Sequence, residues 1–370
     1  MTLRDKLDTQ KLNTQVLDGI ADMVRIVDVN NRVIFFNRSM EETFDGELDQ
    51  LLCPMKEGDD GICDLRFSER TLQTGEIIQR EEKIGEGYFS VKTSPILGDD
   101  GQIKGAIEVF RNKTREKKLQ IEITHRNKQM TKEMNAASNI QKSLVPNPGR
   151  IRDLDFKTLY EPAAILSGDI FDIFPINKTL VAFYMADSVG HGFASSMTTM
   201  FIYQALRNMP KSLQKDPSLA LVELQDRFSK LSLNVSNYFT IVYGVYNSKE
   251  KTLTFANAGH NCPPLIYSKG KVEEVPLRGF PINPLFASGD YDTGQYKLKE
   301  GDQVLLITDG LVECVNQDQV QYGLDRLKAF YEKNPPNFLE DLQEDIRSFS
   351  YRQPEDDMSA LWLKLEGGGH

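Results

Sequence analysis

The stretch LVAFYMADSVGHG, residues 180–192, decides the fold of the longer part of the chain. Its apolar run is unbroken up to Ala186 and stops at Asp187, which is typical of a buried strand. Gly190 and Gly192 follow in a turn, and a segment of helical length begins directly after it. Burying a carboxylate costs free energy unless a partner compensates its charge. We therefore take Asp187 as the first candidate residue of a functional site.

Other acidic residues share this position at the end of an expected strand. They are Asp169, which follows Ser167 and Gly168 and opens a short strand, Asp309, which ends the run 304–308 and precedes Gly310, and the pair Asp356 and Asp357, which precedes the last strand. For any one of them, an acid that only solvates a turn is the simpler interpretation. Several buried carboxylates together need a shared partner of positive charge, and no cluster of basic residues lies near these motifs in the sequence. Because carboxylate oxygens suit Mg²⁺ and Mn²⁺, the sequence predicts a divalent-metal site.

The segment from residue 146 to residue 366 does not alternate strands and helices regularly. Strands are expected over 180–186, 239–246, 252–256, 303–307 and 359–365, and helices over 194–207, 218–233, 324–331 and 338–350. Strand pairs grouped apart from helix pairs favour an α+β fold, with antiparallel sheets and helices stacked outside them.

Two further segments precede this one. Residues 13–110 contain two expected hairpins, 23–27 with 33–36 and 88–93 with 103–110, the second with Asp-Gly in its turn. Residues 111–145 lack helix breakers, and Ile123, Met130, Ala137 and Leu144 recur every seven residues. This spacing predicts a helical linker that forms a dimeric coiled coil, with a single amphipathic helix as the alternative. Residues 367–370 are interpreted as an added tail.

Composition excludes several classes of protein. The net charge of −10 disfavours a nucleic-acid binder, and a nuclease would need a basic groove that the sequence does not offer. The sequence has no apolar run long enough for a membrane span and no signal-peptide pattern at its start. Four cysteines show no disulfide framework, so a cytoplasmic location is expected. Cys53 and Cys63 could form a redox or metal pair, but we interpret them as core residues.

The first segment resembles a PAS domain in the stretches DGIADMVRIVDVNNRVIFFNRSMEETF (18–44) and SPILGDDGQIKGAIEVFRNKTREKK (94–118). The resemblance implies a PAS-like α/β sensor domain over residues 13–110. Residues 1–124 contain no histidine and no cysteine motif of flavin photosensors, so neither haem nor flavin is expected and the ligand is unknown. His125 is interpreted as a solvated helix residue, because no ATP-binding segment of a sensor kinase follows it.

The third segment resembles the sporulation-stage-II-E branch of the metal-dependent protein phosphatases (PPM, protein phosphatase 2C-like). The matching stretches occur in the family's order and are IQKSLVP (140–146), EPAAILSGDIFDIF (161–174), ADSVGHGFASSM (186–197), ANAGHNCPPLIY (256–267), LLITDGLVECVN (305–316) and EDDMSALWLKL (355–365). The resemblance implies an αββα sandwich of two antiparallel sheets flanked by helices.

The resemblance also implies the roles of the acidic residues around two Mn²⁺ or Mg²⁺ ions. Asp187 would bridge the metals, the Ser188 carbonyl would complete one shell, Asp309 and Asp356 would hold the second metal, and Asp169 would act mainly through water. Asp357 is the alternative to Asp356.

The neighbouring residues are expected to support this arrangement. Gly190 and Gly192 would let the backbone approach the site, as glycine allows, and Gly310 follows Asp309 directly. His191 could act as a general acid, but a role in orienting Asp187 is favoured. His260 is interpreted as a turn and packing residue.

The resulting hypothesis is a PAS-regulated two-metal serine/threonine phosphatase. Its expected substrate is a phosphorylated regulatory protein, such as an anti-sigma-factor antagonist. A homodimer through residues 111–145 and an activator protein or small-molecule signal at residues 13–110 are expected, with no nucleic-acid or membrane partner. The signal would shift the linker helix and so change metal binding near Asp187 and Asp309. The alternative is a catalytically silent phosphatase fold that serves as a docking partner.

Overall fold

The computed structural model describes residues 9–43, 68–190, 192–286, 289, 291–352 and 354–367. The chain forms two compact units, Met1–Gln129 and Met130–His370, called the N-terminal and C-terminal units below. Their boundary falls within one helix, α5 (Thr114–Leu144). Among the helices of the described residues, none has the length and apolar character needed to cross a membrane.

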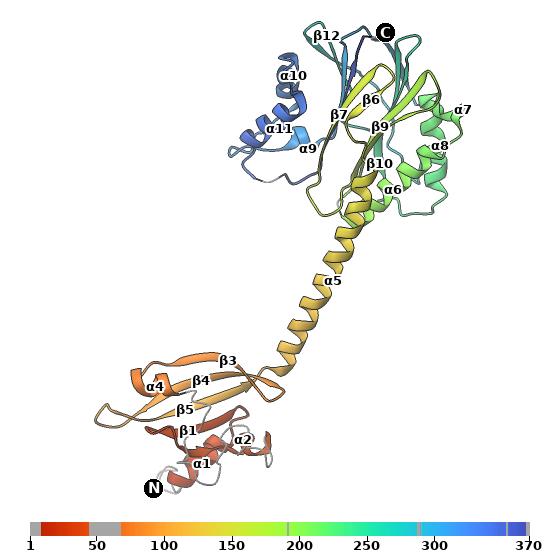
Figure 1. Ribbon diagram of the computed structural model, residues 1–370. Coiled ribbons are helices and arrows are strands. Elements are labelled where there is room, and N and C mark those ends of the chain that lie inside the picture. Colours follow the sequence, from red (N-terminus) through yellow and green to blue (C-terminus); the bar gives the residue numbers. More distant parts are fainter. Residues whose placement is uncertain are drawn as a thin grey trace, which may run out of the picture. The chain divides into compact units, whose positions relative to one another are not determined.

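The N-terminal unit contains a five-stranded antiparallel sheet with the strand order β2-β1-β5-β4-β3 (Figure 1). Its strands are β1 (Met23–Asp28), β2 (Val33–Phe36), β3 (Ile78–Ile84), β4 (Gly87–Leu97) and β5 (Ile103–Asn112), and its helices are α1 (Thr9–Asp18), α2 (Arg38–Thr43) and α4 (Glu69–Thr74). Strand β1 pairs with β2 and β4 pairs with β5, so both expected hairpins are confirmed.

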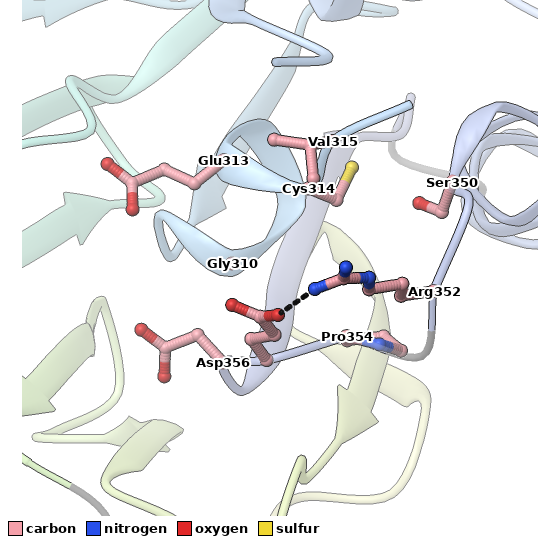
Figure 2. A pocket seen from close by; sticks show the side chains of 9 residues that line it. Gly310, Glu313, Cys314, Val315, Ser350, Arg352, Pro354 and Asp356 are labelled. Carbon is pink, nitrogen blue, oxygen red and sulfur yellow. Dashed lines mark ion pairs between the residues drawn. The ribbon is translucent and has the colours of Figure 1, made fainter. Parts of the chain in front are cut away.

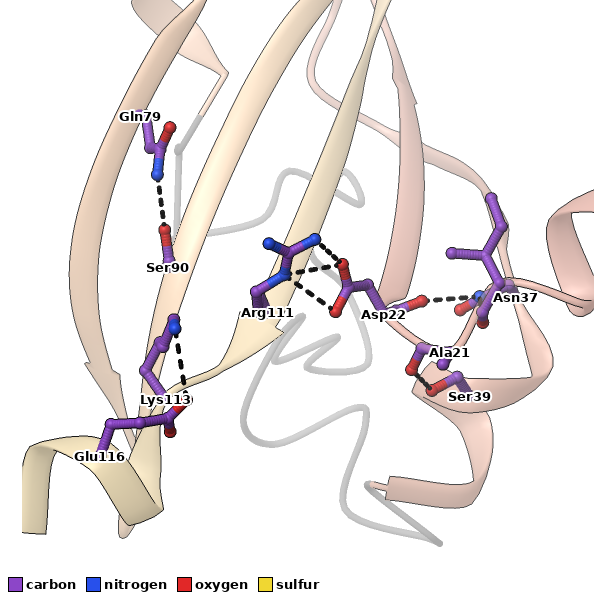
Figure 3. Close-up of polar contacts among 10 residues, drawn as sticks. Ala21, Asp22, Asn37, Ser39, Gln79, Ser90, Arg111, Lys113 and Glu116 are labelled. Carbon is purple, nitrogen blue, oxygen red and sulfur yellow. Dashed lines mark hydrogen bonds and ion pairs between the residues drawn. The ribbon is translucent and has the colours of Figure 1, made fainter.

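Buried polar contacts fix this sheet. Asn37 is fully buried, accepts a hydrogen bond from Val24 N at 2.9 Å and donates to three carbonyls in the last turn of α1 and the chain that leads to β1. Arg25 and Glu108 form a buried ion pair at 2.5 Å across β1 and β5. Figure 3 shows the Arg111 guanidinium against both carboxylate oxygens of Asp22, with the shortest N–O distance 2.8 Å. These contacts tie the start of β1 to its neighbours.

Helix α5 begins later than predicted. Residues 111 and 112 still belong to β5, and the Asn112 side chain accepts a hydrogen bond from Thr114 N at 2.9 Å, which turns the chain into the helix. Apolar residues of the expected coiled-coil seam are exposed within one chain: Ile123 is 58% and Met130 61% exposed. Near the helix end, Ser138 and Gln141 are instead buried.

The C-terminal unit contains two antiparallel sheets. The five-stranded sheet has the order β14-β11-β10-β9-β8 and the six-stranded sheet the order β13-β12-β15-β16-β7-β6. The strands are β6 (Gly149–Ile151), β7 (Leu154–Glu161), β8 (Asp169–Pro175), β9 (Leu180–Ser188), β10 (Phe239–Asn247), β11 (Thr252–Ala258), β12 (Leu265–Ser268), β13 (Lys271–Glu274), β14 (Thr293–Lys297), β15 (Gln303–Ile307) and β16 (Met358–Leu365). The last strand, β16, therefore lies inside its sheet, between β15 and β7.

Helices cover this unit on two sides. They are α6 (Phe193–Arg207), α7 (Lys211–Gln214), α8 (Pro217–Ser229), α9 (Gly310–Glu313), α10 (Leu324–Glu332) and α11 (Phe338–Phe349). Figure 1 shows α7 and α8 on one side of the strands and α10 and α11 on the other. Helix α8 was predicted to reach residue 233, which is wrong: it ends at Ser229, and the chain turns at Ser232, where φ is +54°.

The packing of the core explains why the sequence of β9 is an unbroken apolar run up to Ala186. Successive side chains of a strand point to opposite faces. In β9, Tyr184 packs in a cluster with Ile202 of α6 and Leu224 of α8. Its neighbour Phe183 packs in a second cluster that also contains Leu306 and Leu361 of the six-stranded sheet. Both faces of β9 are therefore buried.

The N-terminus of α8 offers a simple stability test. Asp216 precedes Pro217, and its side chain accepts hydrogen bonds from Ser218 N and Leu219 N at 3.1 and 3.2 Å. Asp216→Ala removes both acceptors, so urea unfolding should show a loss of about 1 kcal/mol. Asp325→Ala is the control, because Asp325 is 98% exposed and its replacement should stay within about 0.5 kcal/mol. Equal effects of both changes would contradict this account.

Candidate active site

The predicted acidic residues gather where strand ends of the two sheets meet. Asp169 is the first residue of β8 and pairs in register with Asp187 of β9. Asp309 follows β15 and precedes the short helix α9. Asp356 lies two residues before β16. The register of β8 with β9 and of β15 with β16 thus sets the positions of these residues.

One pocket holds three of them. Asp187, Asp309 and Asp356 line a cavity of about 310 Å³, called the acid pocket below. Its other lining residues are Ser188, Val189, Gly190, Tyr238, Thr240, Gly259, Asn261 and Glu355. Asp169 is 2% exposed and lies behind this pocket rather than in its lining.

The acid pocket is electrostatically unfavourable for its own carboxylates. Burial, followed by the charges of Asp309 and Asp356, raises the pKa of Asp187 from 3.8 to about 8. Burial and then Asp187 raise the pKa of Asp169 well above its usual value, although the hydrogen bond from Thr308 opposes this. Neighbouring like charges disfavour ionisation, and a cation placed among them reverses the effect.

The donor set fits hard divalent cations, which prefer carboxylate and carbonyl oxygens. In the described part of the chain, no three His, Cys, Asp or Glu side chains are arranged closely enough to form a metal-binding group. A bound cation would have to draw the carboxylates of the acid pocket closer together.

Asp357 has a different environment from Asp356. It is 4% exposed, and its Oδ1 accepts a hydrogen bond from Ala163 N at 2.7 Å. Its Oδ2 accepts hydrogen bonds from Ser167 Oγ at 2.8 Å and from Gly168 N at 2.6 Å. Both oxygens of Asp357 are thus engaged inside the fold, whereas Asp356 lines the acid pocket.

Several polar residues that the sequence did not single out hold the acids. Asn261 Nδ2 donates to Asp309 Oδ2 at 2.9 Å, and Thr308 Oγ1 donates to Asp169 Oδ2 at 2.8 Å. Asn261 follows His260 and Thr308 precedes Asp309, inside motifs already noted. Their position beside these residues was the sequence feature that could have identified them. Glu313 is a further acid near the site: burial, Asp309 and Asp356 raise the pKa of its carboxyl.

His260 is buried at the base of the site. Its Nε2 lies 2.9 Å from the Ile307 carbonyl oxygen, and its Nδ1 lies 3.2 Å from Thr240 Oγ1. Burial lowers the pKa of its imidazole, so the ring is neutral at pH 7. These contacts agree with the packing role expected for it. His191 lies outside the described residues, as do Cys53 and Cys63.

The glycines near the site differ in conformation and in packing. Gly190 and Gly192 have φ of +78° and +94°, and a Cβ at either would meet no atom within 4 Å. Both residues have the positive φ that glycine adopts most readily, and Gly190 lines the acid pocket. Tight backbone packing occurs at Gly168, where a Cβ would lie 3.0 Å from the carbonyl oxygens of Ser188 and Gly190, and at Gly310.

A second cavity, of about 280 Å³, adjoins the acid pocket and shares Glu355 and Asp356 with it. Figure 2 shows Glu313 and Asp356 extending to the same side of this cavity, with Cys314 and Ser350 on the other side. Arg352 lies between them and pairs with Glu355 at 3.6 Å. Among the described residues that line this cavity, Arg352 is the basic one, where the sequence indicated no basic cluster.

Known proteins resemble this part of the chain. The family model of Stage II sporulation protein E (SpoIIE) matches residues 177–366. Phosphoserine phosphatase RsbU of Bacillus subtilis (strain 168) is 28% identical over 187 residues, 49% of this chain and 54% of RsbU. Phosphoserine phosphatase RsbP of the same strain is 24% identical over 230 residues, 60% of this chain and 54% of RsbP. The chain thus spans about half the length of the curated relatives it matches.

Solved structures share the fold. The SiaA-PP2C domain of Pseudomonas aeruginosa matches with a TM-score of 0.57 and 19% identity, over 65% of this chain and 98% of that domain. The RsbU and RsbW domains of a Mycobacterium tuberculosis protein match with a TM-score of 0.51 and 22% identity, over 60% of this chain and 63% of theirs. The expected α+β class of antiparallel sheets and helices is confirmed.

The matched region extends over more than half of the 370 residues and includes Asp187, Asp309 and Asp356. The chain belongs to the SpoIIE family.

Proposed function

We propose that this chain is a metal-dependent phosphatase that hydrolyses phosphoserine or phosphothreonine on a protein. The observation that carries the proposal is the meeting of Asp187, Asp309 and Asp356, from the two sheets, in one pocket that raises the pKa of Asp187 to about 8. Membership of the SpoIIE family and the similarity to two phosphoserine phosphatases support it.

Two Mn²⁺ or Mg²⁺ ions are the proposed cofactors. When bound, such ions lower the pKa of a water and neutralise charge on phosphoryl oxygens. Asp187 would bridge them, Asp309 and Asp356 would hold one, and the Ser188 carbonyl would complete the other's shell. Asp169, behind the pocket, would act through water, while Asp357 holds the backbone around Ser167.

The surrounding residues keep this donor set in place. Asn261 holds one oxygen of Asp309, and Thr308 holds one oxygen of Asp169, so each carboxylate is fixed in orientation. The neutral His260 connects the carbonyl of Ile307 to Thr240 of the pocket lining. Partners of metal ligands that fix orientation in this way commonly contribute ten- to a hundredfold, to order of magnitude, in affinity or activity.

We also propose the finer features expected from the sequence. The two sheets of the C-terminal unit and their helices would form an αββα sandwich, supported by the core cluster that both sheets share. The N-terminal unit would be a PAS-like sensor, supported by its five-stranded antiparallel sheet. Exposed apolar residues on α5 support a homodimer. The substrate would be a phosphorylated regulatory protein, of the anti-sigma-factor antagonist kind.

Metal removal tests the central proposal. Phosphate release from a phosphoserine peptide and from an aryl phosphate should require Mn²⁺ and stop on addition of EDTA. If no turnover is observed, calorimetry of Mn²⁺ binding to the same protein distinguishes two explanations. Binding without turnover indicates an enzyme that awaits an activator. Absence of both contradicts the phosphatase proposal and leaves the silent docking module.

A further inference from the structure

Gln141 connects the end of α5 to the backbone beside the site. Its side chain is 2% exposed. Its Nε2 donates to the Ser167 carbonyl oxygen at 2.8 Å and to Thr199 Oγ1 at 2.9 Å, and its Oε1 accepts from Ser167 N at 3.0 Å. The amide therefore holds both backbone groups of one residue, as a neighbouring strand would.

Ser167 in turn holds the acids. Its hydroxyl donates to Asp357 Oδ2 at 2.8 Å and accepts a hydrogen bond from Asp169 N at 3.0 Å. One residue thus links Asp169, at the start of β8, with the segment that carries Asp356 and Asp357. A displacement of the Ser167 backbone changes both positions together.

The next residue extends the connection to β9. The Gly168 carbonyl oxygen accepts a hydrogen bond from Ser188 N at 3.0 Å. A Cβ on Gly168 would lie 3.0 Å from the carbonyl oxygens of Ser188 and Gly190. Because this packing leaves no free space, the segment 167–168 cannot shift towards β9 without moving the turn after Asp187.

The opposite side of Gln141 is also fixed. Thr199 of α6 donates to the Ser196 carbonyl oxygen at 2.8 Å, which leaves its oxygen lone pairs to accept from Gln141. Leu144, one turn further along α5, packs against the core cluster between the five-stranded sheet and α6. The end of α5 is therefore held in one position relative to Ser167.

We propose that Gln141 is a positioning residue, through which the end of α5 sets the placement of Asp169, Asp187 and Asp356 for metal binding. This inference rests on the proposed function of the acid pocket and names the contact by which the linker helix reaches it. A plain packing role for Gln141 would change the stability of the fold and leave the metal affinity of the folded protein unchanged.

The test compares full-length variants by Mn²⁺ calorimetry, by kcat and KM at several Mn²⁺ concentrations, and by thermal unfolding without metal. Gln141→Met keeps the size of the side chain and removes all three hydrogen bonds. We expect its Mn²⁺ dissociation constant to rise by roughly tenfold or more, with kcat falling at limiting Mn²⁺ and recovering at saturating Mn²⁺. Ser138→Ala, on the same buried face of α5, is the matched control and should match the wild type.

Unchanged Mn²⁺ affinity in folded Gln141→Met, whatever its melting temperature, overturns the inference. If that variant does not fold, Gln141→Glu replaces it: it keeps the acceptor for Ser167 N but loses the amide donor, so weaker Mn²⁺ binding is again expected. Wild-type protein that binds no Mn²⁺ refutes the proposed function itself, and this inference with it, before any variant is compared.

Discussion

Asp187→Asn should remove Mn²⁺-dependent phosphate release and at the same time make the metal-free protein harder to unfold. The first effect follows because Asp187 is the proposed bridge between the two ions. Since replacing partners of metal ligands already costs about 10- to 100-fold, we expect turnover to fall by more than about 100-fold. Calorimetry should detect no Mn²⁺ binding at concentrations that saturate the wild type.

The second effect follows from the pocket's own charges. Burial, and then the charges of Asp309, Asp356 and Asp357, keep the folded Asp187 carboxyl protonated at neutral pH, where the unfolded one is ionised. Holding that proton costs free energy, and an amide, which is uncharged in both states, avoids the cost. Urea unfolding in EDTA should show that the free energy of unfolding rises by roughly 1–3 kcal/mol, which is the scale of the cost of an uncompensated buried polar group. The control is Asp172→Asn, because Asp172 is buried but paired with Arg207 at 2.6 Å. That change should destabilise the protein and leave Mn²⁺ binding intact.

The pH dependence of the metal-free protein tests the same cause. The pKa of Asp187 is raised from 3.8 to about 8 in the folded state, so between these values the folded carboxyl holds a proton that the unfolded one has lost. Stability therefore falls as pH rises across this window. Asp187→Asn should flatten that decline. A decline of equal slope in both proteins would mean that another group causes it.

Gly310→Ala should damage both the fold and the site. A Cβ on Gly310 would collide with the carbonyl oxygen of Asp357 and lie 3.2 Å from that of Asp356. The obstructing atoms belong to the backbone, so relief requires moving the segment that carries Asp356 or the turn that carries Asp309. We expect a stability loss of about 1–3 kcal/mol and a fall in kcat of about 100-fold, because small misplacements of catalytic groups have effects of this size.

Gly149→Ala is the matched control for this change. A Cβ at Gly149 would lie 3.6 Å from the Phe156 ring, an ordinary contact, and Gly149 has no positive φ. Urea unfolding and Mn²⁺-dependent turnover of the two variants should therefore differ sharply. If Gly310→Ala behaved like Gly149→Ala, the backbone around Asp356 would have to be more adaptable than these contacts indicate.

The sequence predicted the strands that are buried on both faces. It also predicted the longer helices of the C-terminal unit. Residues 303–307 were expected as a strand and form β15 without change, because an apolar run that ends at an acid leaves few alternatives. The strands β6, β7, β12, β13 and β14 were not predicted. They are short or half exposed, and β13 reads as Lys271–Glu274 with mostly polar side chains, so no alternating pattern marks it.

For the site, the sequence located the acidic residues but did not show how the environments of Asp356 and Asp357 differ. Asp356 and Asp357 are adjacent in sequence, and only the hydrogen bonds from Ala163, Ser167 and Gly168 distinguish the one that is engaged inside the fold. The positioning role that we propose for Gln141 could not be predicted from the sequence either. A polar residue in a polar helix gives no signal until its partner, Ser167, is placed beside it by tertiary packing.

The central position of β16 has a consequence for biosynthesis. Strand β16 pairs with β7 along Leu154–Glu161, and Asp357 bonds to Ala163, a separation of 194 residues. Pairings between such distant segments form slowly because a long loop must close first. On the ribosome, the C-terminal unit therefore cannot complete its second sheet or bring Asp356 beside Asp187 until residues near 365 have emerged. A nascent chain stalled before that point would expose the edges of β7 and β15 and would be a natural client for chaperones.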